Sequence, residues 1–168
     1  MTVSMYQASA PRFANTLKNL SAILGKAQAH CEARKIDPLV LTAARLYPDM
    51  FALARQVQIA CDTAKGAAAR LAGVEIPKHE DTEQTFGELQ ARIAKTLDFI
   101  ASVKPAQIDG TEDKEVVLKL QGDNVTFKGL QYLLGFAWPN FYFHVAAAYN
   151  ILRHNGVEIG KRDFIGTP

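Results

Sequence analysis

Apolar residues recur every three or four positions along four long stretches of the chain, which is the spacing of one face of an amphipathic helix. The stretches cover about residues 4–34, 49–72, 83–103 and 130–155. Each carries a single apolar stripe flanked by polar positions, as expected of helices that pack together around one core. The pattern therefore predicts four long helices and one packed bundle.

The last stretch has the richest chemistry. It contains the only Trp, and Asn140 and His144 lie one turn apart beside its stripe. Pro139 sits inside the pattern, where it removes a hydrogen bond and should bend the helix one turn before His144. Gly156 is suited to end the helix in a left-handed conformation. The predicted stripe consists of Leu130, Leu134, Ala137, Phe141, Val145, Ala148 and Leu152.

Proline and aspartate mark the other helix ends. Pro11 either kinks the first helix or marks a break after a short initial segment. Asp37 and Pro38 form a helix start, which predicts a short helix reaching about Leu46. Asp49 is predicted as the N-cap of the helix over 49–72, which ends at Gly73.

A stretch of different character precedes the last helix. Residues 115–120 and 125–127 alternate in polarity around Gly122, Asp123 and Asn124, which indicates a β-hairpin. A two-stranded hairpin is marginal alone, so it should lean on the helices. The prediction is an all-α four-helix bundle with a small β-hairpin before the last long helix, in a single domain over 1–168.

Composition is that of an ordinary soluble protein, with 48% hydrophobic and 21% charged residues among 168. A net charge of +2 without any Lys/Arg cluster argues against a nucleic-acid partner. The most apolar window, 136–152, contains Pro139 and several polar residues, which argues against a membrane span.

The first six residues lack a signal-peptide pattern. Cys31 and Cys61 indicate free thiols, with one disulfide left open. We expect a cytoplasmic, bacterial-type protein.

Several segments together resemble a known family. They are Met5 to Ser9, Arg45 to Met50 with Arg55 to Gln58, and the run from Pro139 through His144 to Gly156. Across nearly the whole chain the sequence is similar to the bacterial domain-of-unknown-function family 1993, in the DinB/YfiT-like superfamily. The resemblance implies a DinB-like four-helix bundle, often dimeric. It also implies a divalent metal held by three histidines in many members, used by some in thiol-dependent transferase or isomerase chemistry.

The metal-binding pattern of the superfamily is only partly present. Its last helix supplies two histidines one turn apart before an Arg-x-x-Gly end, and here Arg153 and Gly156 match the end while His144 matches the second histidine. The first position is Asn140. The helix over 49–72 has no histidine, and its polar candidates are Asp49, Gln56 and Gln58. Zinc prefers imidazole, thiolate and carboxylate. No cofactor is therefore favoured, and a Zn or Ni ion held by Asp49 and His144 is the weaker prediction.

Two functions follow from these residues. The first is an uncharacterised DinB-like protein that binds a small molecule, or a degenerate metal-dependent enzyme. Its polar cleft would surround His144, the best catalytic candidate because an oriented neutral imidazole acts as a general base. The alternative for His144 is a core-edge residue satisfied by Gln56 or a backbone carbonyl. The predicted ligand-binding residues are Asp49, Gln56, Asn140, His144 and Tyr149.

The second function is a non-catalytic bundle that acts through its surface, most simply as a homodimer. The missing histidines favour it. So do the alanines of the second long helix, which permit close approach of a neighbouring helix: Ala60, Ala64, Ala67, Ala68 and Ala69.

Overall fold

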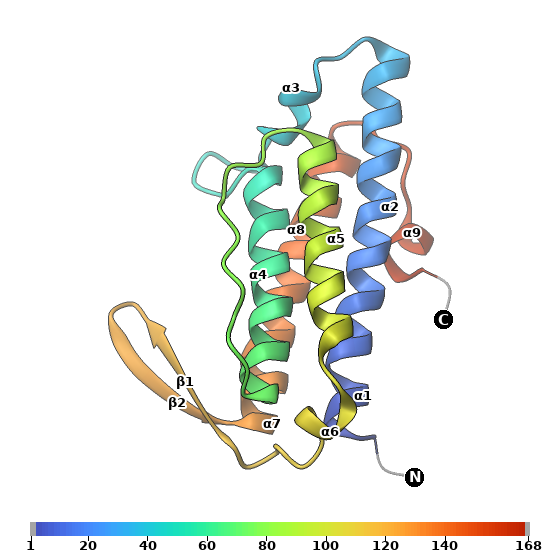
Figure 1. The fold of residues 1–168 in the computed structure, drawn as a ribbon. Coiled ribbons are helices and arrows are strands. Elements are labelled where there is room, and N and C mark those ends of the chain that lie inside the picture. Colours follow the sequence, from blue (N-terminus) through green and yellow to red (C-terminus); the bar gives the residue numbers. More distant parts are fainter. Residues whose placement is uncertain (1–2, 167–168) are drawn as a thin grey trace.

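The computed structural model describes residues 3–166, and its fold is mostly helical with a small two-stranded antiparallel sheet (Figure 1). Residues 1–2 and 167–168 lie outside that range. They are part of the predicted domain over 1–168, and residues 1–2 are also part of the segment that was searched for a signal peptide. Four long helices lie side by side: α2 (Ala10–Arg34), α4 (Leu53–Ala72), α5 (Phe86–Ser102) and α8 (Trp138–His154). The shorter elements are α1 (Met5–Ala8), α3 (Pro38–Thr42), α6 (Pro105–Ile108), β1 (Glu115–Leu120), β2 (Asp123–Lys128), α7 (Gly129–Tyr132), the π-helical segment η1 (Leu133–Ala137) and α9 (Lys161–Ile165).

The connection between α4 and α5 determines how the long helices are directed. It runs back along the outside of α4, so α4 and α5 point the same way while α2 and α8 point the opposite way (Figure 1). The connection covers residues 73–85 without regular secondary structure. Thirteen extended residues reach about 43–47 Å, enough to return along a 20-residue helix, which is about 30 Å long. We call residues 74–84 the strap.

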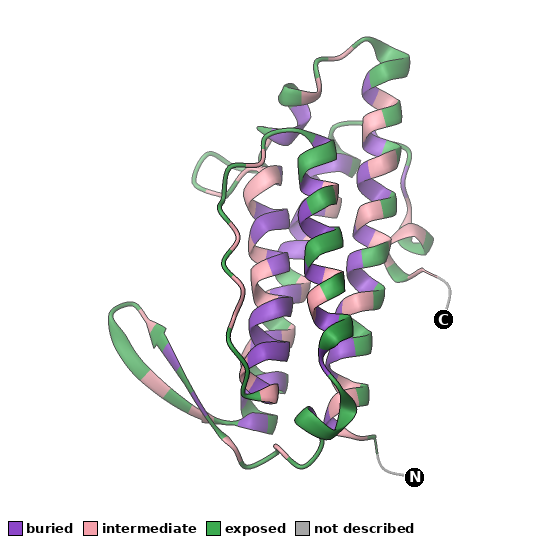
Figure 2. Cartoon of the chain, viewed as in Figure 1, coloured by how far each residue is buried: buried purple, intermediate pink, exposed green. Residues whose placement is uncertain are grey.

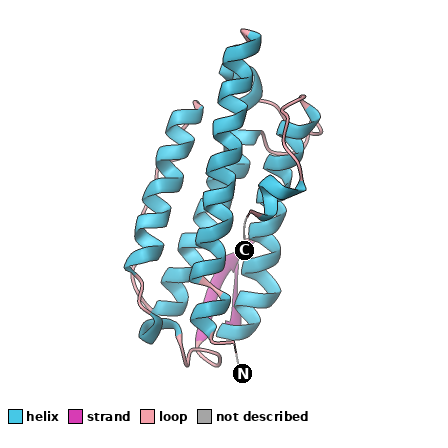
Figure 3. Cartoon of the chain, turned by 90° about the vertical axis from the view of Figure 1, so that its right-hand side faces the viewer, coloured by secondary structure: helices cyan, strands magenta, loops and turns pink. Residues whose placement is uncertain are grey.

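Buried residues from all four long helices form one core, and the buried positions lie mainly on the inward faces of these helices (Figure 2). Phe13 of α2 and Phe141 of α8 meet edge to face at its centre, with ring centroids 4.9 Å apart. The most extensive helix contact joins α4 to α8. The buried alanines of α4 allow this approach. Figure 3, turned by 90°, shows the long helices running alongside one another with the two strands near one end.

Several predicted helix ends are confirmed and two are wrong. The chain breaks at Ser9, with Pro11 in the first turn of α2. Asp37 caps α3 through its Oδ1, which accepts the N–H of Leu39 at 2.9 Å, but α3 ends at Thr42 and does not reach Leu46. Asp49 is not an N-cap, because α4 begins after Ala52 and Asp49 lies in an exposed turn. Gly73 ends α4 with a φ of +72°, as predicted.

The segment before α8 departs from the predicted stripe. The N–H of Trp138 donates to the carbonyl of Leu133, five residues earlier, so the chain makes one wide π-helical turn just before Pro139. This is the local response to a proline that offers no N–H. The wide turn rotates the preceding residues: Leu133 is buried, whereas Leu130 and Leu134 are 42% and 44% exposed. The stripe is confirmed only from Ala137 onward.

The hairpin forms as predicted, with a different turn. Leu120 pairs with Asp123, so the two-residue loop is Gln121 and Gly122, both with positive φ. Asp123 and Asn124 belong to β2 and are not turn residues. The tip projects away from the helices (Figure 1), while Val116 and Leu118 of β1 are buried against them. Within residues 3–166, no helix is both long and apolar enough to span a lipid bilayer.

Candidate functional site

Three polar contacts join α4 to the helical segment 129–154 along the face where they pack. From one end to the other, they pair Gln56 with His144, Thr63 with Asn140 and Arg70 with Tyr132. The α4 members are seven residues apart, which is two helical turns and therefore one face. We call this row of three pairs the α4–α8 seam. It holds Gln56, Asn140 and His144 of the predicted ligand-binding set.

The geometry at His144 defines its tautomer. Its Nδ1 lies 2.7 Å from Oε1 of Gln56, and Nε2 of Gln56 donates to the carbonyl of Phe51 at 3.0 Å. The amide is oriented by that second bond, so its oxygen faces the ring and Nδ1 carries the proton. No hydrogen-bond partner for Nε2 of His144 occurs among the described residues. That atom therefore keeps an unshared electron pair.

The surroundings of His144 favour the neutral form of its imidazole ring. Burial lowers the pKa of His144, and the positive charge of Arg55 lowers it further. Both causes oppose a second proton on the ring. A neutral histidine with a fixed N–H on one side and a lone pair on the other is able to accept a hydrogen bond or take up a proton.

Two predicted ligand-binding residues lie elsewhere. Asp49 is exposed in the turn before α4, and Tyr149 packs edge to face against Phe164 of α9. Asn140 points to α4, where its Nδ2 donates to Oγ1 of Thr63 at 2.8 Å. Thr63 could not be predicted from the sequence as the partner of Asn140, because a threonine within a helix has no distinctive pattern.

The chemistry of the donors does not fit the metal ion implied by the superfamily. His144 supplies one imidazole, its neighbours Gln56 and Asn140 supply amides, and Asp49 is exposed at a turn. No cluster of three or more His, Cys, Asp or Glu side chains suited to a metal occurs within residues 3–166. Zinc sites are built from imidazole, thiolate and carboxylate donors, so no chemical step is assigned to a metal here.

A second polar cluster lies between α4, α5 and the strap, and the sequence analysis missed it. Arg92 of α5 is 2% exposed, and its Nη2 lies 2.8 Å from Asp62 and 2.9 Å from Asp81. Its Nη1 bonds both carboxylate oxygens of Glu83 at 3.0 Å. Arg92 therefore fastens the strap to the helices. Its sequence signal was an arginine placed between Leu89 and Ile93 on an apolar face.

The same cluster contains buried polar atoms without partners in the described chain. They are Nε of Arg92, Oγ1 of Thr96 and Nδ1 of His79. His79 is partly buried, and its burial, followed by the positive charges of Lys65 and Arg92, lowers its pKa. Gln58 joins the cluster by donating to Glu83 at 3.0 Å. The ion pairs of Arg92 with Asp81 and Glu83 and the bond from Gln58 to Glu83 hold the strap against the helices.

The cysteines are free and buried, as the sequence favoured. Burial raises the pKa of the Cys61 thiol to about 12. Because the thiolate is the reactive form, Cys61 is not poised as a nucleophile at neutral pH.

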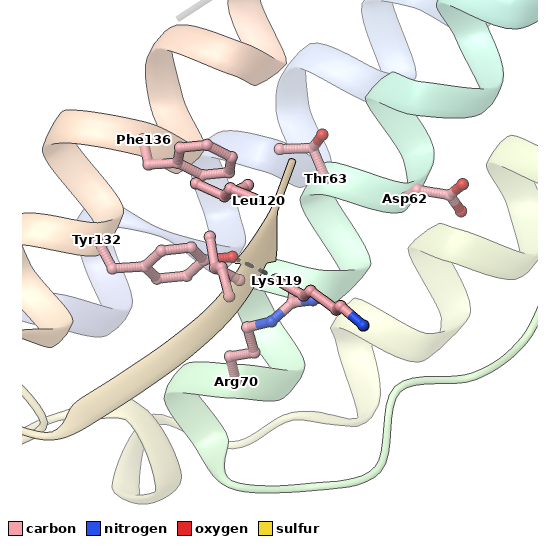
Figure 4. A pocket seen from close by; sticks show the side chains of 8 residues that line it. Asp62, Thr63, Arg70, Lys119, Leu120, Tyr132 and Phe136 are labelled. Carbon is pink, nitrogen blue, oxygen red and sulfur yellow. Dashed lines mark hydrogen bonds between the residues drawn. The ribbon is translucent and has the colours of Figure 1, made fainter. Parts of the chain in front are cut away.

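A cavity of about 330 Å³ opens where the hairpin meets α4, at the end of the seam farthest from His144 (Figure 4). Thr63 and Arg70 of α4 reach it from one side, and Tyr132 and Phe136 from the other. Its size falls within the range of small-molecule sites. The cavity was not predicted, because it depends on how the hairpin folds against the helices.

The mostly helical fold, with a hairpin before the last long helix and a histidine on the inner face of that helix, defines a DinB-like class of protein. The chain belongs to the family called Domain of unknown function (DUF1993), whose model matches residues 5–165. It is also similar to a crystal structure of a DinB family member protein from Shewanella denitrificans, at 43% identity and a TM-score of 0.90. That match covers 97% of this chain and 92% of the other. No curated protein matches the chain.

Proposed function

We propose that this DinB-like protein binds a small organic molecule at His144. The observation that carries the proposal is the unshared electron pair on Nε2 of a mostly buried, neutral imidazole whose other nitrogen is fixed by Gln56. Nε2 of His144 is not one of the fully enclosed unpartnered atoms of residues 3–166, so a molecule from outside the core can reach it and act as a hydrogen-bond partner. A ligand with an N–H or O–H group would supply that partner.

The electrostatics around His144 support a donor group on the ligand. Arg55 places positive charge near the ring and also stacks over Phe51, with its guanidinium carbon 5.9 Å from the ring centroid. A protonated imidazole is disfavoured there, so the ring acts as an acceptor. If the bound group were acidic enough to give up its proton, the same nitrogen would serve as a general base. Catalysis is a further step that binding does not require.

The test is a thermal-shift screen of small molecules against the wild-type protein and two variants. His144→Ala removes the proposed acceptor, whereas His154→Ala changes an exposed histidine at the end of the same helix. A ligand at 100 times its Kd should stabilise the protein by about 2.7 kcal/mol. We expect that shift to survive in His154→Ala and to vanish in His144→Ala. A screen in which every hit stabilises both variants equally would refute binding at His144.

A second function, homodimerisation, is favoured by the outer face of the last helical segment. From residue 129 to residue 152 the chain contains no Asp, Glu, Lys or Arg. Leu130, Leu134 and Phe143 are 42%, 44% and 57% exposed on this segment. A two-fold interface brings the same surface of two copies together, so an uncharged apolar face avoids like-charge repulsion.

Light scattering tests the homodimer. We expect a two-chain mass for the wild-type protein that falls to one chain in Phe143→Lys. Ile165→Lys, which places the same charge at a residue 52% exposed on α9, should leave the mass unchanged. A single-chain mass for the wild-type protein at high concentration would exclude the homodimer and would leave ligand binding at His144 untouched.

A further inference from the structure

The cavity between the hairpin and α4 has a wall of hydrogen-bond donors. Tyr132 accepts a hydrogen bond from Nη1 of Arg70 at 3.3 Å, and Thr63 accepts one from Nδ2 of Asn140 at 2.8 Å. A hydroxyl that accepts a bond still has its own proton to donate. Neither hydroxyl donates to another group within residues 3–166. Two O–H protons are thus available where both residues line the cavity (Figure 4).

Charge in the cavity is positive. Arg70 has no carboxylate partner in the described chain, and its only bond there is the one to Tyr132. Lys119 of β1 also lines the cavity. The one acidic lining residue, Asp62, is paired with Lys65 and Arg92 at 2.8 Å each. Its negative charge is therefore already compensated, and the guanidinium of Arg70 is not.

The backbone of α4 is shaped to hold the guanidinium in place. Gly66, one turn before Arg70, is buried, and a Cβ at this glycine would lie 2.5 Å from Nη1 of Arg70. A glycine inside a helix costs about 0.5–1 kcal/mol relative to alanine. The missing side chain lets Arg70 fold back against its own helix toward Tyr132. The position of the guanidinium thus depends on a residue that is otherwise unfavourable there.

The remaining lining is apolar. Leu118 and Leu120 of β1 and Phe136 of η1 line the cavity beside the donors, and the ring of Phe136 stacks on that of Tyr132 with centroids 6.1 Å apart. A ligand that contacts both the donors and these apolar side chains has an anionic end and an apolar body. From these contacts, we propose that the cavity binds a small carboxylic acid with an apolar body, its carboxylate held by Arg70, Tyr132 and Thr63.

The planar fork of a guanidinium matches the two oxygens of a carboxylate. The hydroxyls of Tyr132 and Thr63 add donors from two further directions. Burial raises the pKa of Tyr132, so its hydroxyl keeps its proton at neutral pH. This site uses neither Gln56 nor His144, and it stands or falls independently of ligand binding at His144.

The experiment is an NMR titration of the ¹⁵N-labelled protein with benzoate and hexanoate, compared with benzamide and hexanamide as uncharged counterparts. Acetate and inorganic phosphate test the need for the apolar body. We expect the two apolar acids to shift the backbone amides of Leu118, Lys119 and Leu120, and to bind at least about tenfold more tightly than their amides, a difference of 1.4 kcal/mol. Acetate and phosphate should bind more weakly than either.

Variants connect binding to the named residues. Arg70→Gln should weaken benzoate binding at least about tenfold, which corresponds to one charge-assisted hydrogen bond. Gly66→Ala should weaken it as well while leaving the fold intact, because it displaces the guanidinium and keeps its charge. Arg153→Gln, which changes an exposed arginine on α8, is the control and should bind as the wild type does.

Four results would overturn the proposal. The first is equal affinity for benzoate and benzamide, and the second is unchanged affinity in Arg70→Gln. The third is the absence of any shift of the hairpin amides at acid concentrations up to about 20 mM, because the dissociation constant would then lie above the millimolar range. Binding of phosphate in preference to both apolar acids would overturn the assignment of ligand class.

Discussion

The Nδ1 atom of His144 on α8 lies 2.7 Å from Oε1 of Gln56 on α4, and the two residues are 88 positions apart in the chain. Both side chains are mostly buried, at 7% and 1% exposed. Because the amide is also bonded to the carbonyl of Phe51, the pair couples the start of α4 to the middle of α8. The bond serves the fold and the proposed ligand site together.

Removing both members of this pair should destabilise the protein by less than the sum of the two single losses. Gln56→Leu leaves the N–H of a buried imidazole without a partner, which costs about 1–3 kcal/mol. His144→Leu leaves the amide oxygen unpaired at similar cost. The double variant removes both groups, so its loss should be smaller than the sum by about 0.5–3 kcal/mol. Urea unfolding of the four proteins measures this coupling, and strictly additive losses would argue against the bond.

The depressed pKa of His144 predicts a dependence of stability on pH. The folded-state pKa lies below the unfolded value of about 6.5. Between the two values the unfolded chain binds more protons, so this contribution is complete above pH ~6.5 and is lost as the pH falls through the folded pKa. His79, whose pKa is also lowered, adds a loss in the same direction.

Comparison with His144→Gln separates the two histidines. Unfolding free energies measured from pH 8 to pH 5 should show the wild type losing more stability below about pH 6.5 than the variant does. The remaining slope of the variant then includes the part due to His79. Identical slopes in both proteins would mean that His144 titrates normally.

Arg92 is expected to be the most sensitive charged position in the described chain. It is buried among Asp62, Asp81 and Glu83, and removing one partner from such a group leaves uncompensated charge. Arg92→Met should therefore lower the unfolding free energy by about 3–5 kcal/mol. Arg12→Met on the exposed face of α2 provides the matched control and should change it by less than about 0.5 kcal/mol. Equal effects would show that the network contributes nothing specific.

The strap itself should respond to the same change. In Arg92→Met, amide exchange over residues 79–83 should accelerate, because Arg92 bonds Asp81, Glu83 and the carbonyl of Glu80. Local opening of this kind precedes global unfolding when a segment is held by few contacts. Unchanged exchange in the strap would place the effect of Arg92 in the helices instead.

The sequence predicted the helices well because their evidence is local. Stripes at three- and four-residue spacing, Pro11, Asp37 and Gly73 each act within a turn or two, and the structure confirms them. The errors arose where the local conformation depends on a distant residue or on an irregular turn. Pro139 was expected to bend a helix, and it follows a π-helical turn that exposes Leu130 and Leu134.

The candidate site shows the same division. Asn140 and His144 were placed correctly toward α4 because their spacing fixes their face. Asp49 was misplaced, since its position followed from an N-cap that the chain forms at Ala52. The Arg92 cluster could not be predicted, because it depends on the strap returning along α4, and periodicity carries no information about the path of a connection.

The start of α7 offers a last test, because the backbone there passes closer to a neighbour than any side chain would permit. A Cβ on Gly129 would overlap the carbonyl oxygen of Thr111, a backbone atom that cannot swing aside. The N–H of Leu130 donates to the carbonyl of Glu112 at 2.9 Å and holds the two segments together. This contact closes the base of the hairpin.

Gly129→Ala should therefore destabilise the protein by about 1–3 kcal/mol, the usual cost of forcing extra atoms into a packed region. Gly135 is the matched control, since it lies only six residues further on, is exposed, and has space for a Cβ, with no atom within 4 Å of that position among the described residues. Gly135→Ala should be neutral or stabilising by up to about 1 kcal/mol, because alanine is the better helix former. Urea unfolding of both variants decides the matter. If the two alanines had the same effect, the close approach at Gly129 would not be what positions the hairpin against α4.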